Sequence, residues 1–180
     1  MTVSRSLPRA SRTTWLAPLT IAAAGLLAYA DSFRGVFMLD DFLSIVENPH
    51  LRRLWPLWDV WKTPMESTLA GRPVAQWTFA LNYAAGKLDV WGYHAGNLLV
   101  HLCAALVLYG LLRRTFLTAP LRGRYGGVAT GLAGVIALLW TVHPLQTQSV
   151  TYLVQRAEAL MGLCYLLTLY AVVRGAADPS

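Results

Sequence analysis

The chain has 180 residues, of which 56% are hydrophobic and only 13% are charged, and its mean hydropathy is +0.44. A soluble domain carries about 25% charged residues, so this composition excludes an ordinary soluble enzyme and favours a membrane protein. The net charge of +6 is divided among separate segments instead of forming one basic face, which argues against a nucleic-acid partner. Cys103 and Cys164 both lie in apolar stretches, as buried thiols do.

Four apolar stretches approach the length of about 20 residues that a helix needs to cross the hydrocarbon of a bilayer. The third and fourth are marginal and need flanking residues. We therefore expect an all-α integral membrane protein with about four transmembrane helices and an outer loop of short interfacial helices. The predicted helices are 15–30, 93–112, 126–142 and 157–173, with a basic N-terminus (1–14), outer loops at 31–92 and 143–156, a cytoplasmic loop at 113–125 and a cytoplasmic tail at 174–180.

The orientation follows from the basic residues. Arginines precede the first apolar stretch, occupy the loop between the second and third, and follow the fourth. Of the nine acidic residues, only Asp178 lies in these segments. We therefore expect both ends and the Arg113–Arg124 loop to be cytoplasmic, and the two remaining loops to face outward with lipid around the helices.

The N-terminus also permits a second interpretation. A basic segment, the apolar stretch Leu16–Leu27 and the sequence Ala28-Tyr29-Ala30 together have the form of a secretory signal peptide. Cleavage after Ala30 would leave the remaining topology unchanged but would remove the first helix. We favour a retained membrane anchor.

The long outer loop contains two predicted helices. Trp55, Trp58 and Trp61 are three residues apart, which is typical of a short helix lying in the membrane interface. A second helix is predicted to begin at Gly71-Arg72-Pro73, with proline at its first position, and to end near Ala85. The alternative is an amphipathic hairpin that packs against the other helices.

Asp40 and Asp41 follow the first apolar stretch closely. Placing two adjacent carboxylates close to the hydrocarbon of a membrane costs free energy, and carboxylates in such positions often serve as catalytic bases or cation ligands. The alternative is a solvated loop or a helix cap.

Other polar residues lie in or beside the predicted membrane helices. Asn97 and His101 are four residues apart, on one helical face, and we expect them to form hydrogen bonds between helices. Arg156 begins the last helix, where a guanidinium and free backbone N–H groups can hold a phosphate; the alternative is an ion pair with Glu158. No phosphate loop, nucleophile elbow or metal-ligand spacing is present in the sequence.

The chain resembles the N-terminal membrane region of the transmembrane-and-tetratricopeptide-repeat O-mannosyltransferases and their bacterial relatives, members of the C-type glycosyltransferase superfamily. The resemblance covers about residues 28–173. It is carried by an ordered series of short motifs, each weak alone: Tyr29-Ala30-Asp31-Ser32-Phe33, Phe37, Asp40-Asp41, Asn48-Pro49-His50-Leu51, Gly71-Arg72-Pro73, Leu81-Asn82-Tyr83, Gly92-Tyr93-His94, Asn97-Leu98, His101, His143-Pro144-Leu145-Gln146-Thr147-Gln148-Ser149-Val150 and Gln155-Arg156-Ala157-Glu158-Ala159-Leu160.

The resemblance implies a protein O-glycosylation activity that uses a polyprenyl-phosphate sugar as donor and a protein Ser/Thr hydroxyl as acceptor. It implies Asp40 or Asp41 as the catalytic base, and the second aspartate as a group that orients the acceptor or binds a divalent ion. Arg72 and Arg156, with His143 as a lesser candidate, are expected to bind the donor phosphate. Metal use varies across the superfamily and stays open. The bacterial relatives imply an inner-membrane protein with Asp40 and Asp41 on the periplasmic face.

The chain departs from the family in length. Family members have many more membrane helices, and many carry C-terminal tetratricopeptide repeats. We therefore expect this chain to be incomplete as a catalyst unless further helices complete it. The alternative function is a non-catalytic multi-pass membrane protein that binds lipid or a partner, and the genomic sequence downstream of Ser180 discriminates between the two.

Overall fold

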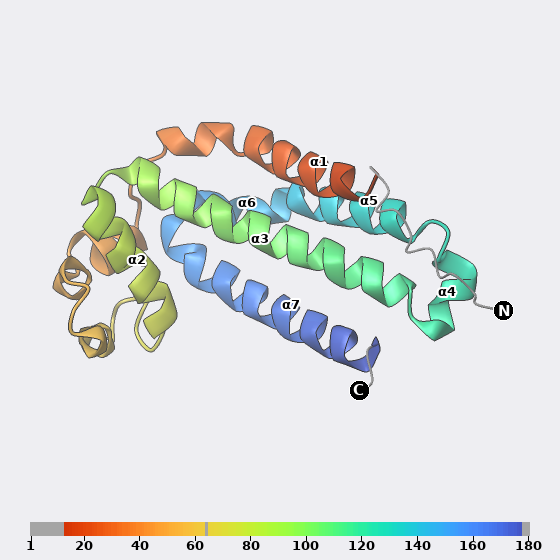
Figure 1. Cartoon of the computed structure of the whole chain (residues 1–180). Helices are drawn as coiled ribbons and strands as arrows, with labels where there is room; N and C mark the ends of the chain where they lie inside the picture. Colours follow the sequence, from red (N-terminus) through yellow and green to blue (C-terminus); the bar gives the residue numbers. More distant parts are fainter. Residues whose placement is uncertain (1–12, 64, 178–180) are drawn as a thin grey trace.

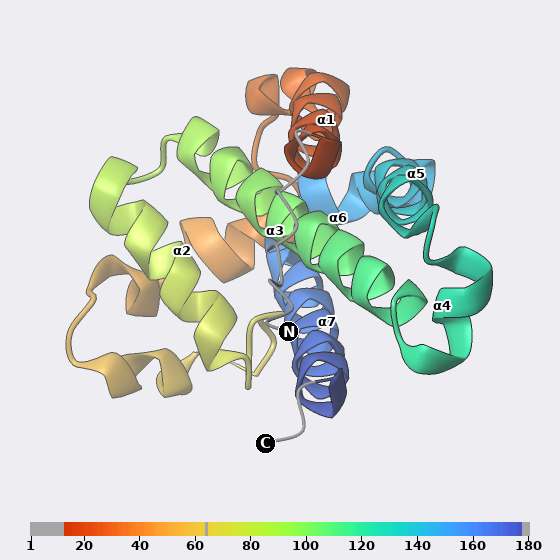
Figure 2. The same cartoon turned by 45° about the vertical axis from the view of Figure 1, so that its right-hand side comes forward.

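The computed structural model describes residues 13–63 and 65–177, and in these residues every regular element is a helix. The long helix α3 (Val90–Phe116) lies at the centre, with α1 (Thr13–Ala28), α5 (Ala129–Thr141) and α7 (Arg156–Ala177) packed around it (Figures 1 and 2). The prediction of an all-α membrane fold is confirmed.

Three helical segments are long and apolar enough to cross a membrane: 15–34, 90–116 and 153–176. At 1.5 Å per residue, the 27 residues of α3 extend about 40 Å, more than the hydrocarbon thickness. Asp89 caps its start by accepting from the Trp91 N–H, and two arginines in its last turn suit the negative end of the helix dipole.

The third predicted helix differs from its expected form. It begins at Ala129 and ends at Thr141, so its 13 residues are too short to cross alone. Pro144 cannot continue the hydrogen-bond ladder and disfavours helical backbone in the residue before it. The chain bends by 54° there and continues through η5 (Pro144–Gln146) and α6 (Thr147–Thr151), so the structure has a fourth candidate span only if this bent pair counts as one span; otherwise the pair is a re-entrant loop.

The segment between α1 and α3 is built from short elements. They are η1 (Ala30–Arg34), η2 (Phe42–Val46), η3 (Pro49–Arg52), η4 (Leu57–Lys62) and α2 (Pro73–Gly86). The predicted helix after Gly71-Arg72 is confirmed as α2, with Pro73 at its start. The predicted tryptophan helix forms only in part: the 3₁₀ helix η4 contains Trp58 and Trp61, whereas Trp55 precedes it. The Trp55 and Trp58 rings lie largely exposed and 6.0 Å apart. An additional short helix, α4 (Ala119–Tyr125), occupies the arginine-rich loop.

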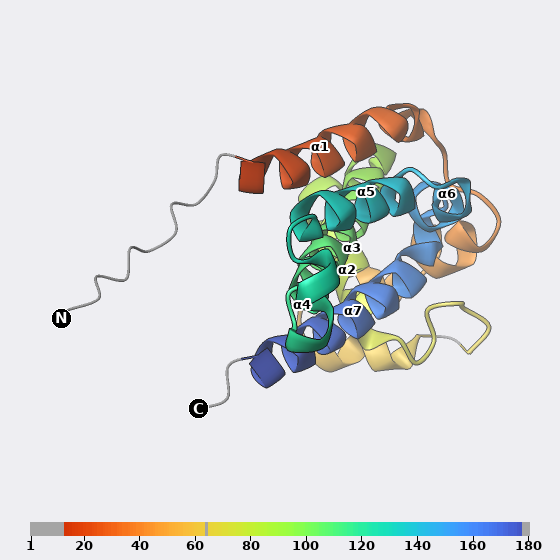
Figure 3. The same ribbon diagram turned by 90° about the vertical axis from the view of Figure 1, so that its right-hand side faces the viewer.

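The arginine-rich and acidic segments lie at opposite ends of the molecule. The start of α1, the helix α4 and the end of α7 are together at one end, and the segment between α1 and α2 is at the other (Figures 1 and 3). This is the grouping that the positive-inside rule requires of a folded bundle.

Two larger apolar clusters, beside a smaller third one of Tyr29, Leu98 and Val150, hold the helices together. One joins α1, α3 and α5 through Ile21, Tyr109 and buried alanines, whose small side chains let helices approach closely. The other joins the acidic end to α7 and includes Ile45, Phe79 and Leu153. The second cluster supports the site described next.

Candidate functional site

Asp41 lies in a tight turn between η1 and η2. Its backbone N–H donates to the carbonyl oxygen of Met38 at 2.9 Å, and its Oδ2 accepts from the Met38 N–H at 3.0 Å. Leu39, inside the turn, has a φ of 45°, in the left-handed region that costs a residue with a Cβ atom about 1–2 kcal/mol. Backbone strain of this kind persists where surrounding contacts enforce it, and it is frequent at functional sites.

The Asp41 carboxylate also binds a segment far along the chain. Its Oδ1 accepts from the backbone N–H of Val154 at 2.9 Å, in η6 (Leu153–Gln155) directly before α7. The residue is only 1% exposed. Burial raises the pKa of Asp41 above the ordinary value for aspartate; the two N–H donors lower the pKa, and the charge of Asp40 raises it further. A carboxylate with a raised pKa is a stronger base than an ordinary one.

Asp40 has a different environment from Asp41. Its side chain is exposed, and its backbone N–H donates to Tyr152 Oη at 3.1 Å. Within the described residues neither aspartate belongs to an ion pair. The two predicted carboxylates therefore share one turn, but only Asp41 is held inside the fold.

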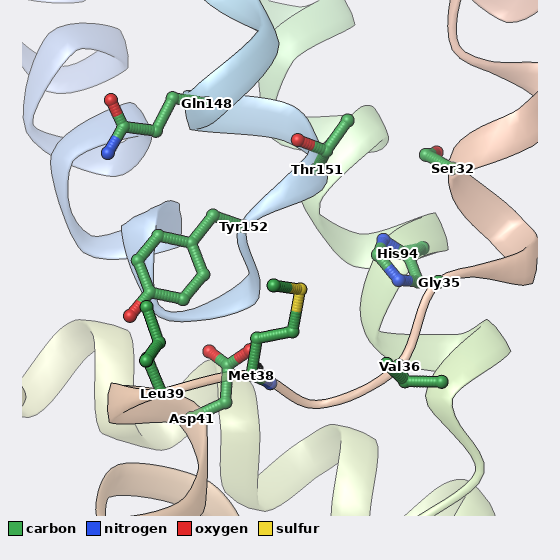
Figure 4. A pocket seen from close by; sticks show the side chains of 10 residues that line it. All are labelled: Ser32, Gly35, Val36, Met38, Leu39, Asp41, His94, Gln148, Thr151 and Tyr152. Carbon is green, nitrogen blue, oxygen red and sulfur yellow. Dashed lines mark hydrogen bonds between the residues drawn. The ribbon is translucent and has the colours of Figure 1, made fainter.

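A pocket of about 410 Å³ opens beside Asp41, within the 300–1,000 Å³ typical of small-molecule sites. Asp41 and Tyr152 line it from one side, and His94 and Ser32 from the other (Figure 4). Its remaining lining is Gly35, Val36, Met38, Leu39, Gln148 and Thr151, so the polar groups are one carboxylate and several neutral hydrogen-bonding side chains.

Arg156 is fully buried at the start of α7 and is surrounded by neutral acceptors. Its Nε donates to Asn97 Oδ1 at 2.6 Å, its Nη1 to Asn82 Oδ1 at 2.6 Å, and its Nη2 to the carbonyl oxygen of Tyr93 at 2.7 Å. The guanidinium also lies 4.2 Å from the centre of the Phe79 ring, in cation–π geometry. These contacts join α2, α3 and α7 at one point.

The alternative that Arg156 pairs with Glu158 is wrong. Glu158 forms its ion pair with Arg72, at 2.8 Å, and both side chains are partly exposed. Arg156 and Glu158 are two residues apart on α7, so their side chains point to different sides of the helix and do not meet. Arg72 therefore lies on the outer side of the α7 start, and Arg156 on the inner side.

His143 lies apart from the Asp41 pocket. It is exposed at the bend after α5, where its Nδ1 accepts from the Leu145 N–H at 3.2 Å. The structure thus distributes the predicted phosphate ligands over three separate environments, and their role stays a prediction.

The predicted bonds between helices at Asn97 and His101 are confirmed. Asn97 Nδ2 donates to the carbonyl oxygens of Val150, Tyr152 and Leu153 at 3.2–3.3 Å, which fixes the segment that contacts Asp41. His101 Nε2 lies 2.9 Å from the carbonyl oxygen of Thr141, and its ring stacks on Trp140.

His94 and Gly96 are among the site residues that had no role in the sequence interpretation. His94 belongs to the motif Gly92-Tyr93-His94, but only the structure places it opposite Asp41. Gly96 leaves the space for Arg156, because a Cβ there would lie 2.7 Å from Arg156 Nη2. In the part of the chain that the structure describes, no group of three or more His, Cys, Asp or Glu residues is placed to hold a metal ion.

Sequence comparison finds relatives along most of the chain. It is 34% identical over 178 residues to the protein O-mannosyl-transferase Tmtc3 of Drosophila melanogaster, covering 89% of this chain and 19% of that protein. It is 35% identical over 156 residues to the human protein O-mannosyl-transferase TMTC1 (82% and 17%), and 30% identical over 173 residues to the human TMTC4 (90% and 23%).

The chain therefore spans about a fifth of the length of the curated relatives it matches. No family model matches it, and no solved structure matches it at a significant level. The resemblance inferred from the short motifs is confirmed by these relatives, whose names carry the activity that the motifs implied.

Proposed function

We propose that this chain, which is related along most of its length to the transmembrane-and-tetratricopeptide-repeat protein O-mannosyl-transferases, is the part of such a glycosyltransferase that supplies its catalytic base. The donor would be a polyprenyl-phosphate sugar and the acceptor a Ser/Thr hydroxyl of a protein. The observation that carries the proposal is Asp41, a buried carboxylate of raised pKa, fixed by two backbone N–H groups at the wall of a pocket.

Asp41 would act as the general base. As the acceptor oxygen attacks the anomeric carbon, the proton of the hydroxyl passes to the Asp41 carboxylate. The bond between the anomeric carbon and the phosphate oxygen breaks, and its electron pair leaves with the polyprenyl phosphate. The configuration inverts, because attack and departure occur on opposite faces of the sugar. Asp40, exposed on the same turn, would orient the acceptor.

The leaving phosphate is already negative, so it needs cations instead of an acid. Arg72 is the more accessible of the two arginines, and its pair with the partly exposed Glu158 contributes little stability. His143 is exposed and would contribute a hydrogen bond. Arg156 would act through its charge, because its donors are already used and no ion pair neutralises it among the described residues.

The orientation is part of the proposal. The arginine-rich end would be cytoplasmic, and the Asp40-Asp41 turn would lie at the opposite membrane surface, which is the periplasmic face in a bacterial inner membrane. Lipid-linked sugars presented at that surface would reach the pocket beside Asp41.

Separate Asp40→Asn and Asp41→Asn variants test the proposal in the complete protein. Both keep the side-chain size and remove one charge. Asp41→Asn should lower sugar transfer by about 10²–10⁴-fold, the usual contribution of a general base. Asp40→Asn should keep most of the activity. Parent rates in both variants would contradict the proposal and favour the alternative, a non-catalytic membrane protein in which Asp41 only holds Val154.

A further inference from the structure

The pocket beside Asp41 contains a histidine that the proposed mechanism does not use. His94 is 1% exposed, and neither of its ring nitrogens has a hydrogen-bond partner. Its ring points into the pocket from α3 and faces the side that carries Asp41 and Tyr152 (Figure 4). Buried polar groups in folded proteins are nearly always hydrogen-bonded, so a buried histidine with two unpartnered nitrogens at a pocket wall indicates a ligand-binding side chain.

We propose that His94 binds a hydroxyl group of the transferred sugar, and that the pocket between His94 and Asp41 is the sugar-binding part of the donor site. This inference rests on the proposed function and deepens it. It assigns to His94 a role in sugar recognition, separate from the base chemistry of Asp41.

The character of the lining supports a sugar over a phosphate. No lysine or arginine is among the lining residues, and the Asp41 carboxylate would repel a phosphate group. Ser32, Gln148 and Thr151 offer neutral donors and acceptors, as hydroxyl groups require. The aromatic and aliphatic groups of Tyr152 and Val36 offer surface for the C–H faces of a ring.

The chemistry of the imidazole supports a sugar over the acceptor side chain. A neutral imidazole has one donor and one acceptor nitrogen, and both are unpaired in His94. One acceptor hydroxyl would satisfy a single nitrogen while it also meets the base. A sugar carries hydroxyls on several carbon atoms, so one of them can bind a ring nitrogen of His94 without also meeting the base.

The backbone at Gly35 passes directly beside the His94 ring. A Cβ atom at this position would lie 2.6 Å from His94 Nε2, so only glycine lets the chain pass the ring so closely. Gly35→Ala is therefore a second way to disturb the site, since it displaces the imidazole without removing it.

Binding of two lipids to the complete protein in nanodiscs provides the test. The probes are polyprenyl-phosphate mannose and the same polyprenyl phosphate without sugar. We expect His94→Ala to weaken binding of the mannose lipid about tenfold, the effect of a lost hydrogen bond in a site, and to leave binding of the sugar-free lipid unchanged. Gly35→Ala should do the same, and His94→Gln should recover part of the loss. His50→Ala, a histidine outside the pocket, is the matched control and should change neither affinity.

Donor lipids that each lack one mannose hydroxyl make the test sharper. For one of them, His94→Ala should cause no further loss, because the hydroxyl that His94 binds is already absent. An equal loss with every deoxy donor, equal loss with both lipids, or no loss at all would overturn the inference. A changed KM for the acceptor with unchanged donor binding would overturn it as well.

The outcome also separates this inference from the proposed function. If the parent protein binds both lipids equally but Asp41→Asn loses sugar transfer, the sugar-binding assignment fails and the base assignment stands. If the mannose lipid binds selectively through His94 but Asp41→Asn transfers sugar at the parent rate, the base assignment fails and the sugar-binding assignment stands.

Discussion

Replacement of Arg156 by methionine should destabilise the fold strongly. The guanidinium satisfies three acceptors at 2.6–2.7 Å: the side-chain oxygen of Asn97 and the carbonyl oxygen of Tyr93, which are buried, and the side-chain oxygen of Asn82, which is partly buried. Asn97 cannot turn to compensate, because its amide nitrogen is bound to three carbonyl oxygens. Each orphaned acceptor costs about 1–3 kcal/mol.

Methionine carries no charge, so the variant avoids the several kcal/mol that burying an ion costs, and this offsets part of the loss. The net expectation is a decrease of about 3 kcal/mol in the free energy of unfolding, comparable to breaking a buried charged network. The Arg156→Lys variant keeps the charge but lacks the planar guanidinium that reaches acceptors on both α2 and α3. Its free energy of unfolding should therefore also decrease, by about half as much as that of Arg156→Met.

Equilibrium unfolding in mixed detergent–SDS micelles, followed by tryptophan fluorescence, measures these changes. Arg174→Met is the matched control, since Arg174 is exposed in the last turn of α7, and it should stay within about 0.5 kcal/mol of the parent. If Arg156→Met were equally neutral, the network would not hold the three helices and this reasoning would be refuted.

Three further predictions concern Gly96, the orientation in the membrane and the first helix. Gly96→Ala should destabilise the fold while Gly162→Ala in α7 does not, because a Cβ at Gly96 meets Arg156 and a Cβ at Gly162 meets nothing within 4 Å; equal thermal stability of the two variants would refute this. In a background without Cys103 and Cys164, a cysteine at Met65 should react with an impermeant reagent from outside and a cysteine at Gly123 should not, and the reverse labelling would overturn the orientation. The intact mass of the purified protein should include residues 1–30, since Ile21 of α1 is buried against α3 and α5; a species that begins at Asp31 would support the signal-peptide interpretation.

Local sequence patterns were sufficient for part of the helical structure. Apolar length predicted α3 and α7, and the proline after Gly71-Arg72 predicted the start of α2. The third helix was predicted to end at Val142, one residue beyond its observed end at Thr141, but the short helices η5 and α6 that follow the bend were not predicted, because the segment 143–156 lacks an apolar stretch of helical length.

The site depends on contacts that no local pattern contains. Asp41 binds Val154 across 113 positions of sequence, and Arg156 binds Thr78 and Asn82 across more than 70. Spacing alone suggested Glu158 as the partner of Arg156, although the helix turns that carboxylate toward Arg72. The sequence motif held His94 but contained no sign that its ring faces a pocket.

The pH dependence of transfer by the Asp40→Asn variant tests most directly that Asp41 is the base. The base must be ionised, so the rate should fall as the pH drops through the raised pKa of Asp41. The charge of Asp40 contributes to that raised pKa, so its removal should lower the pKa and move the acid limb of the rate profile to lower pH. An active Asp40→Asn enzyme with its acid limb displaced in this direction is the predicted result. An unchanged limb, or loss of transfer in Asp40→Asn while Asp41→Asn stays active, would contradict the assignment.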